Sequence, residues 1–162
     1  MVFEMYTLKK LSVLALKLNS KIVSAESCTA GLLSASLTEI SGSSAFFEQG
    51  YITYSNLSKT SVLGVENKIL EKYGAVSEQV AKQMAEGALK RSNSTIAISI
   101  TGIAGPGGSD CKPEGLVCFA VTKKNGKTRT KTMEYGPLGR SKIRSSAVKT
   151  ALNLLFEEMS VI

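Results

Sequence analysis

The chain of 162 residues contains no histidine and no tryptophan, and only three cysteines and three prolines. Histidine is the usual general base or zinc ligand in enzymes that hydrolyse amides and esters. Its absence excludes a Ser-His-Asp triad, a Cys-His pair and the common histidine-based zinc sites. Nucleophilic chemistry in this chain would need lysine, a carboxylate, or tyrosine acting with one of them, as its base.

The cysteines, Cys28, Cys111 and Cys118, are odd in number, and no two have CxxC spacing. A disulfide framework or a zinc site is therefore not expected, which suits a reducing cytoplasm. No apolar run approaches the roughly 20 residues of a membrane span. Lys9 and Lys10 interrupt the apolar stretch that a signal peptide would need. We expect a cytoplasmic protein with no membrane partner and no metal.

The formal net charge is +7, which is compatible with a nucleic-acid partner. The basic residues are spread along the chain, with one local excess over residues 123–131. No aromatic side chains lie between these residues, as a surface that stacks single-stranded bases would need. Lysines on a hairpin also discourage edge-to-edge strand pairing. Nucleic acid is therefore not the expected partner, and an anionic small molecule is another use for the charge.

Hydrophobic periodicity predicts alternating helices and strands. Helices are expected over about 8–18, 32–37, from 56 onward, 78–91 after an N-cap at Ser77, and 138–159. Strands are expected over about 21–25, 46–54, 95–100, 116–121 and 128–135, with a tight turn at Asn125-Gly126 between the last two. The length suits a single domain, residues 1–162. This order predicts an α/β fold in which helices cover both faces of a mixed sheet.

Two loops follow buried strands, where open α/β sheets collect their ligands. The loop over residues 26–31 would open a helix, whose free N–H groups and dipole favour an anion. Serine and threonine at this position are also ordinary helix caps. The loop over residues 101–109 is rich in glycine, which permits close backbone approach to a ligand. It contains neither a P-loop nor a GxGxxG sequence. Arg140 and Arg144, one helical turn apart, could hold a phosphate or simply form a solvated helix face.

Lys59 is the candidate base. The pKa of an ordinary lysine is about 10.4, so burial or nearby positive charge must lower it before a neutral amine can take a proton from a serine. Tyr54, at the end of an expected strand, could relay that proton or orient the amine. The residue types alone leave open that Lys59 is an exposed helix residue, that Tyr54 is an amphipathic strand end, and that Cys28 is a small buried apolar residue.

Seven segments and Lys59, taken together, resemble the CinA C-terminal domain family. They are Ala25-Glu26-Ser27-Cys28-Thr29-Ala30-Gly31, Gly42-Ser43-Ser44-Ala45-Phe46-Phe47, Gly50-Tyr51-Ile52-Thr53-Tyr54-Ser55-Asn56 with Lys59, Leu63-Gly64-Val65, Gly74-Ala75-Val76-Ser77, Ala85-Glu86-Gly87-Ala88, and Thr101-Gly102-Ile103-Ala104-Gly105-Pro106-Gly107-Gly108. The match covers nearly the whole chain in order. The family often carries glycine where Ala30 stands, and residues 110–114 differ more freely. The chain resembles the stand-alone form of the family, without an additional N-terminal domain.

The resemblance implies a three-layer α/β/α sandwich, commonly a homodimer, without metal or organic cofactor. The family's characterised activity is nicotinamide mononucleotide deamidase, which hydrolyses the carboxamide to nicotinate mononucleotide and ammonia. By the matching positions, the resemblance implies Ser27 as nucleophile, assisted by Lys59 and Tyr54, with backbone N–H groups of residues 28–30 as candidate oxyanion donors. Substrate contacts are then expected from Glu26, Cys28, Thr29, Ala30, Gly31, Thr101, Gly102, Ala104, Gly105, Arg140 and Arg144.

Three alternatives stay open at this point. Cys28, Lys59 and Glu26 are the residue types of a Cys-Lys-Glu amidase, and a thiolate is a stronger nucleophile than a serine hydroxyl. The family's historical association with competence and DNA damage suggests an interaction module that would use the basic hairpin. The third alternative is a nucleotide-binding domain that has lost catalysis.

Overall fold

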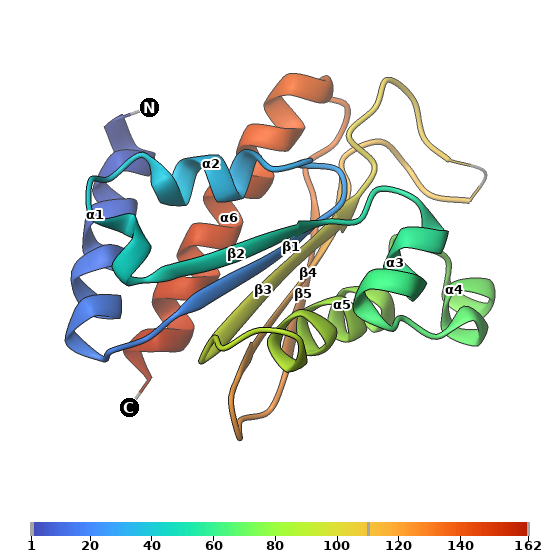
Figure 1. Cartoon of the computed structure of the whole chain (residues 1–162). Coiled ribbons are helices and arrows are strands. Elements are labelled where there is room, and N and C mark those ends of the chain that lie inside the picture. The colour runs from blue at the N-terminus through green and yellow to red at the C-terminus, as the bar shows by residue number, and fades with distance from the viewer. Residues whose placement is uncertain (1, 110, 162) are drawn as a thin grey trace.

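A computed structural model describes residues 2–109 and 111–161 as a mixed five-stranded sheet between two layers of helices (Figure 1). The strand order is β2-β1-β3-β4-β5. Strand β1 is parallel to both β2 and β3, whereas β4 runs antiparallel to β3 and β5 antiparallel to β4. The bounds are β1 Ile22–Glu26, β2 Phe47–Ile52, β3 Ile96–Gly102, β4 Leu116–Lys123 and β5 Arg129–Glu134. This arrangement confirms the expected α/β sandwich with a mixed central sheet.

The helices divide between the two faces of the sheet (Figure 1). One face carries α1 Val2–Lys17, α2 Leu32–Thr38 and α6 Arg140–Ser160; the other carries α3 Asn56–Leu63, α4 Asn67–Tyr73 and α5 Glu78–Lys90. A short 3₁₀ helix, Ser43–Ala45, precedes β2. The N-cap predicted at Ser77 is confirmed, because its hydroxyl accepts from the Val80 N–H. Helix α1 begins earlier than the pattern indicated. Helix α4 was not predicted, since its seven residues bury only Leu70 and show no periodicity.

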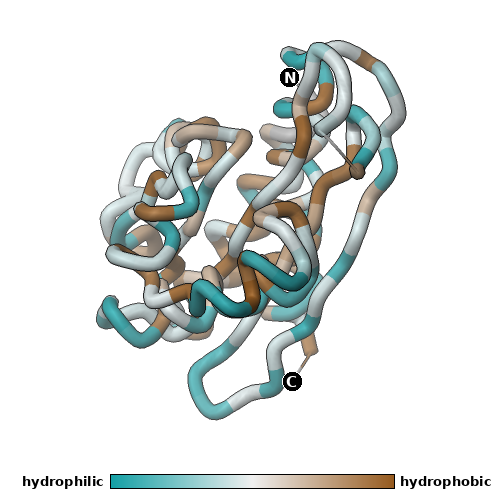
Figure 2. The backbone as a smooth tube through the Cα atoms, turned by 90° about the vertical axis from the view of Figure 1, so that its right-hand side faces the viewer, coloured by the Kyte–Doolittle hydropathy of each residue, from teal (hydrophilic) through white to brown (hydrophobic). Residues whose placement is uncertain are grey.

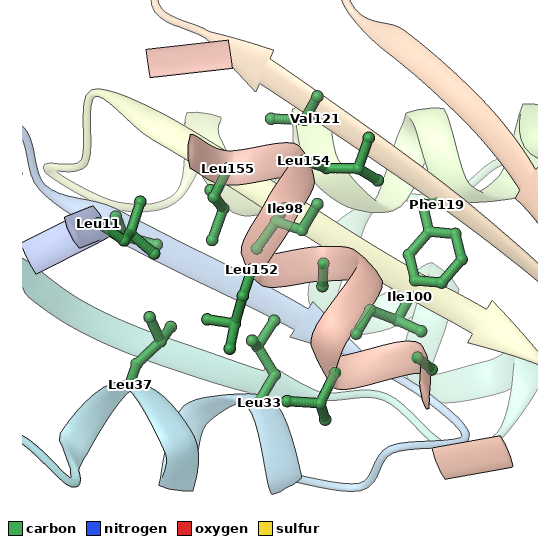
Figure 3. Packing of buried hydrophobic residues seen from close by; sticks show 14 of the residues in the cluster. Leu11, Leu33, Leu37, Ile98, Ile100, Phe119, Val121, Leu152, Leu154 and Leu155 are labelled. Atoms are coloured by element: carbon green, nitrogen blue, oxygen red, sulfur yellow. The ribbon is translucent and has the colours of Figure 1, made fainter. Parts of the chain in front are cut away.

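The core is split by the sheet into two clusters, because successive side chains of a strand point to opposite faces. Isoleucines 96, 98 and 100 of β3 pack toward α1, α2 and α6, whereas Ala97 packs toward α5. Figure 3 shows Leu152, Leu154 and Leu155 of α6 over this first face, beside Ile98, Ile100 and Phe119. The larger side chains lie under α6 and the smaller ones under α5, which allows α5 to approach the sheet closely.

The hairpin at the end of the sheet contains the turn that the sequence predicts. Five residues, 124–128, separate β4 from β5. The Gly126 N–H donates to the Lys123 carbonyl at 2.9 Å, with Asn125 in the left-handed region at φ 64°, which confirms a turn at Asn125-Gly126. Strand β5 is an exposed edge strand, and the hairpin tip is hydrophilic at the bottom of Figure 2. Lys123 and Arg129 form ion pairs with Glu158 of α6 at 3.5 and 3.0 Å. Part of the local positive charge is therefore neutralised within the fold, which weakens the interpretation as a nucleic-acid surface.

Candidate active site

The carboxyl ends of the three mutually parallel strands meet at one edge of the sheet, at Glu26, Ile52 and Gly102. The segments that follow them, residues 27–31, 53–55 and 103–115, therefore gather at the same place (Figure 1). The first turn of α6 reaches this edge as well, through the hydrogen bonds of Arg140 and Arg144. The candidate residues lie on these segments, on the strand ends that precede them or near the start of α6, except Lys59, which lies on α3 directly after residues 53–55.

A buried lysine and a serine meet at the centre of this edge. Lys59 Nζ lies 3.0 Å from Ser27 Oγ, 2.8 Å from the Thr53 carbonyl and 3.4 Å from the Tyr54 carbonyl. Ser27 is 8% exposed and Lys59 is 1% exposed. A neutral amine has two N–H groups and one lone pair. The two carbonyls can take the N–H groups, which leaves the lone pair for the Ser27 hydroxyl.

Lys59 occupies this position because of how α3 begins. Ser55 caps the helix, its hydroxyl accepting from the Ser58 N–H, and Lys59 follows in the first turn with its stem among buried residues. Burial lowers the pKa of Lys59 to about 8, against an ordinary value of 10.5, because the charged form loses its hydration. Lys59 is therefore not an exposed helix residue. Its ammonium and amine forms are both accessible near neutral pH.

Cys28 points to the other side of the sheet. Its side chain is 5% exposed and belongs to the apolar cluster under α1, α2 and α6, together with Ala104. Burial raises the pKa of its thiol to about 11, so that the thiolate is scarce at neutral pH. The structure thus brings Ser27, and not Cys28, within hydrogen-bond distance of Lys59.

The Glu26 side chain is enclosed by the protein, whereas the family resemblance implied that it contacts the substrate. Its side chain is fully buried and accepts from the N–H groups of Gly31, Leu33 and Ser34 at 2.9–3.1 Å and from the Ser34 hydroxyl at 2.6 Å. The first N–H groups of α2 are therefore used inside the protein. This corrects the expectation that the start of this helix offers an anion site, because an internal carboxylate already fills it.

The turn between β1 and α2 leaves two N–H groups free. Helix α2 starts at Leu32, and the Ala30 N–H donates to the Ser27 carbonyl, so Ala30 is not an oxyanion donor. Within the described part of the chain, the N–H groups of Cys28 and Thr29 have no hydrogen-bond partner in another residue. Ala30 adopts φ 48° and Gly31 φ 96°. A left-handed alanine is strained by about 1 kcal/mol relative to glycine, so a glycine at position 30 would adopt this turn more easily.

The Tyr54 side chain, close in sequence to Lys59, faces the solvent and is 59% exposed. Its hydroxyl accepts from Arg140 at 3.1 Å, and the other arm of that guanidinium donates to the Gly105 carbonyl at 3.1 Å. The atom of Tyr54 that approaches Lys59 is its main-chain carbonyl and not its phenol. Arg140 therefore ties the segments after β2 and β3 to the start of α6.

Arg144 holds the turn that follows Ser27. Its guanidinium donates to the Thr29 carbonyl at 3.0 Å, and its Nε is buried without a partner among the described residues. The Thr29 hydroxyl is likewise buried and unpartnered there. Both arginines named from the sequence thus reach the carboxyl edge of the sheet.

The glycine-rich segment after β3 offers mainly its backbone. The Thr101 hydroxyl donates to the Ala75 carbonyl at 2.8 Å, and Ala104 is buried in the core. Gly102 and Gly105 remain partly exposed. A Cβ at Gly105 would lie 2.4 Å from the Glu114 carboxyl carbon, and one at Gly102 would lie 2.7 Å from Val117. Close packing thus requires a glycine at position 102, whereas at position 105 the backbone favours glycine through its φ of 83°.

Sequence reasoning missed two residues of this site. The Thr53 carbonyl orients Lys59, and Ser34 donates twice to Glu26. Nothing in the sequence pattern marks a main-chain carbonyl, and Ser34 resembles any serine on a short helix. Among residues 2–109 and 111–161, no group of three or more metal-ligating side chains is found, and no helix is long and apolar enough to cross a bilayer.

The family model described as the CinA C-terminal domain matches residues 6–159. A CinA-like protein of Mycolicibacterium gilvum is 47% identical over 149 residues, which is 91% of this chain and 35% of that protein. A CinA-like protein of Akkermansia muciniphila is 47% identical over 133 residues, which is 82% of this chain and 32% of that protein. The chain thus spans about a third of the length of these relatives.

Solved structures have the same fold over the whole domain. The competence/damage inducible protein CihA from Agrobacterium tumefaciens is 45% identical, with a TM-score of 0.87 over 93% of this chain and 94% of that one. The competence damage-inducible protein A (ComA) from Klebsiella pneumoniae is 33% identical, with a TM-score of 0.93 over 98% of each chain.

Proposed function

Since this chain belongs to the CinA C-terminal domain family, we propose that it is an amidohydrolase that converts nicotinamide mononucleotide to nicotinate mononucleotide and ammonia. The observation that carries this proposal is the buried Lys59 amine at 3.0 Å from the Ser27 hydroxyl in a chain without histidine. A serine needs a base to become a nucleophile. Lys59, with its pKa lowered to about 8, supplies that base near neutral pH.

In the first half of the reaction, Ser27 Oγ bonds to the carboxamide carbon while its proton passes to Lys59 Nζ. The carbonyl oxygen becomes an oxyanion, for which the free N–H groups of Cys28 and Thr29 are the nearest unused donors in the turn. Each such donor contributes roughly 3 kcal/mol in comparable sites. The C–N bond then breaks, and the Lys59 ammonium returns the proton to the departing ammonia.

In the second half, water replaces the amine. Neutral Lys59 takes a proton from a water molecule as its oxygen bonds to the acyl carbon. The ester bond to Ser27 breaks, and the serine oxygen recovers the proton from Lys59. The same base therefore serves both halves. Arg140, which donates to the exposed Tyr54 hydroxyl, and Arg144 supply positive charge for the phosphate of the nucleotide.

Incubation of the purified protein with nicotinamide mononucleotide is expected to release ammonia and nicotinate mononucleotide in equal amounts. Coupled ammonia detection and chromatography of the nucleotide measure the two products. Nicotinamide riboside, which lacks the phosphate, should react with a higher KM. Thermal stabilisation by nicotinamide mononucleotide without either product would contradict hydrolysis and support the nucleotide-binding domain that has lost catalysis.

The pH dependence of kcat/KM is expected to follow the deprotonation of Lys59. Because the neutral amine is the active form, kcat/KM should rise tenfold per pH unit below about pH 8 and level off above it. At pH 7 roughly a tenth of the lysine is neutral. A profile measured from pH 6 to 10 tests this. A flat profile, or one that falls with rising pH over this range, would rule out a lysine base.

A further inference from the structure

Glu26, the residue before the nucleophile, stabilises the turn that follows it. Its carboxylate accepts from the Gly31 N–H at 3.0 Å, so that this hydrogen bond closes a loop over residues 27–30. The Leu33 N–H and both donors of Ser34 fix the same carboxylate to the first turn of α2. Because the carboxylate is fully buried and surrounded by these donors, it has no path to a substrate.

A neighbouring strand leaves room for this arrangement. Ser24 Oγ lies 2.8 Å from Ser34 Oγ and 3.4 Å from Glu26 Oε1. A Cβ at Gly50 of β2 would lie 2.3 Å from Ser34 Oγ and 2.9 Å from Ser24 Oγ. The polar cluster of Ser24, Glu26 and Ser34 therefore fits only against a strand that has no side chain at this point.

The main chain of the same residue connects to the base. The Glu26 carbonyl accepts from the Thr53 N–H at 2.9 Å, and the Thr53 carbonyl accepts from Lys59 at 2.8 Å. One residue is thus bonded through its side chain to the turn that carries the nucleophile and through its backbone to the segment that orients the base. A change of side chain alters the first connection and leaves the second in place.

We propose that Glu26 is a positioning residue, whose buried carboxylate holds the turn over residues 27–31 so that the Ser27 hydroxyl faces Lys59 and the N–H groups of Cys28 and Thr29 stay free for the oxyanion. This role rests on the proposed amidase chemistry of the site. It differs from an acid–base role, because Glu26 exchanges no proton with the substrate. Misplacement of a reacting group by about 1 Å costs on the order of 100-fold in rate.

Glu26→Gln is the informative variant. Glutamine keeps the shape but has one acceptor oxygen, so its NH₂ group must face either the N–H groups of Gly31 and Leu33 or the two donors of Ser34. The turn must then shift. Glu39→Gln, on an exposed residue just after α2, makes the same change of charge and serves as control.

The rate of covalent labelling of Ser27 by a fluorophosphonate, followed by mass spectrometry, reports the nucleophile independently of any natural substrate. In this reaction the Ser27 oxygen bonds to phosphorus, fluoride leaves and Lys59 takes the proton. Glu26→Gln is expected to be labelled about 100-fold more slowly than the wild type, and Glu39→Gln at the wild-type rate. On nicotinamide mononucleotide, Glu26→Gln should lower kcat while KM changes little, and the rise of activity toward pH 8 should persist because Lys59 is retained.

Equal labelling of Glu26→Gln and wild type overturns the positioning role, and so does loss of the pH-dependent rise, which would make Glu26 a base. If Glu26→Gln does not fold, Ser34→Ala decides, since it keeps the carboxylate and removes the 2.6 Å bond of the Ser34 hydroxyl to Glu26 together with its 2.8 Å contact with Ser24. Slower labelling supports the role and an unchanged rate overturns it. A wild type that is labelled at Ser27 but releases no ammonia from nicotinamide mononucleotide refutes the proposed substrate alone. A wild type that is not labelled refutes both proposals.

Discussion

Ser27→Ala is expected to lower ammonia release from nicotinamide mononucleotide by about 10⁵-fold or more, because the reaction loses the atom that forms the acyl-enzyme. The variant should keep its fold, since a small side chain is replaced by a smaller one at a position that is 8% exposed. Steady-state assays with a sensitive ammonia readout and circular dichroism of the same preparation test both statements. Ser36→Ala on α2, whose hydroxyl donates to the Leu32 carbonyl, is the matched control and should keep full activity.

The paired variant Cys28→Ser separates the two nucleophiles that the sequence left open. Cys28 packs among apolar residues on the opposite side of the sheet from Lys59, and burial raises the pKa of its thiol. Cys28→Ser should therefore keep most of its activity and lose some stability, because a hydroxyl replaces a thiol in an apolar cluster. The reverse outcome, an active Ser27→Ala and an inactive Cys28→Ser, would assign the chemistry to the cysteine.

Lys59→Met is expected to reduce kcat/KM by about 10³-fold or more, which is the range of a lost general base. Methionine fills the space of the buried stem but has no proton acceptor near Ser27. Lys59→Arg keeps the positive charge and cannot be deprotonated in this pH range, so it should be inactive at every pH from 6 to 10. The control, Lys68→Met, removes an exposed lysine of α4 that pairs with Glu66 at 2.6 Å and should keep the wild-type profile.

Measurement of kcat/KM against pH for all three lysine variants distinguishes loss of the base from loss of charge. If Lys59→Met retained activity with an unchanged pH profile, the base would be another group, and the short contact between Lys59 and Ser27 would be structural. If Lys59→Arg were active, positive charge and not proton transfer would be the contribution of this position.

The local features of the fold were predictable because their signals lie within a few residues. The apolar run over residues 95–100 predicted β3, and Ser77 predicted the start of α5. The hairpin after residue 123 was also predicted, with its turn at Asn125-Gly126. Helix α4 was missed because it buries too little to leave a pattern. Capping residues and apolar periodicity are features of the sequence itself, so that the helices and strands that they specify can be predicted without knowledge of the tertiary structure.

The residues of the candidate site were also visible, but their roles were not. Lys59 and Tyr54 were named as candidates from their residue types and positions, Ser27 was assigned as nucleophile from family resemblance, and the alternatives for Cys28 and Glu26 could not be separated. Which face of the sheet each side chain occupies decided these points: Ser27 lies toward Lys59, whereas Cys28 lies in the opposite core cluster. The phenol of Tyr54 contacts Arg140, 86 residues away in the chain. No local pattern encodes such a pairing.

By itself, the sequence determined the chemistry that is excluded, the order of helices and strands, and the presence of a serine and a lysine without histidine. Only the tertiary structure decided that Lys59 is buried beside a serine 32 residues away, with its pKa lowered to about 8. The physical reason is that desolvation and hydrogen-bond geometry depend on everything packed around a group. The role of Glu26 also depends on the tertiary structure, because the N–H groups that bind its carboxylate belong to α2 and reach it only where this helix packs against the sheet.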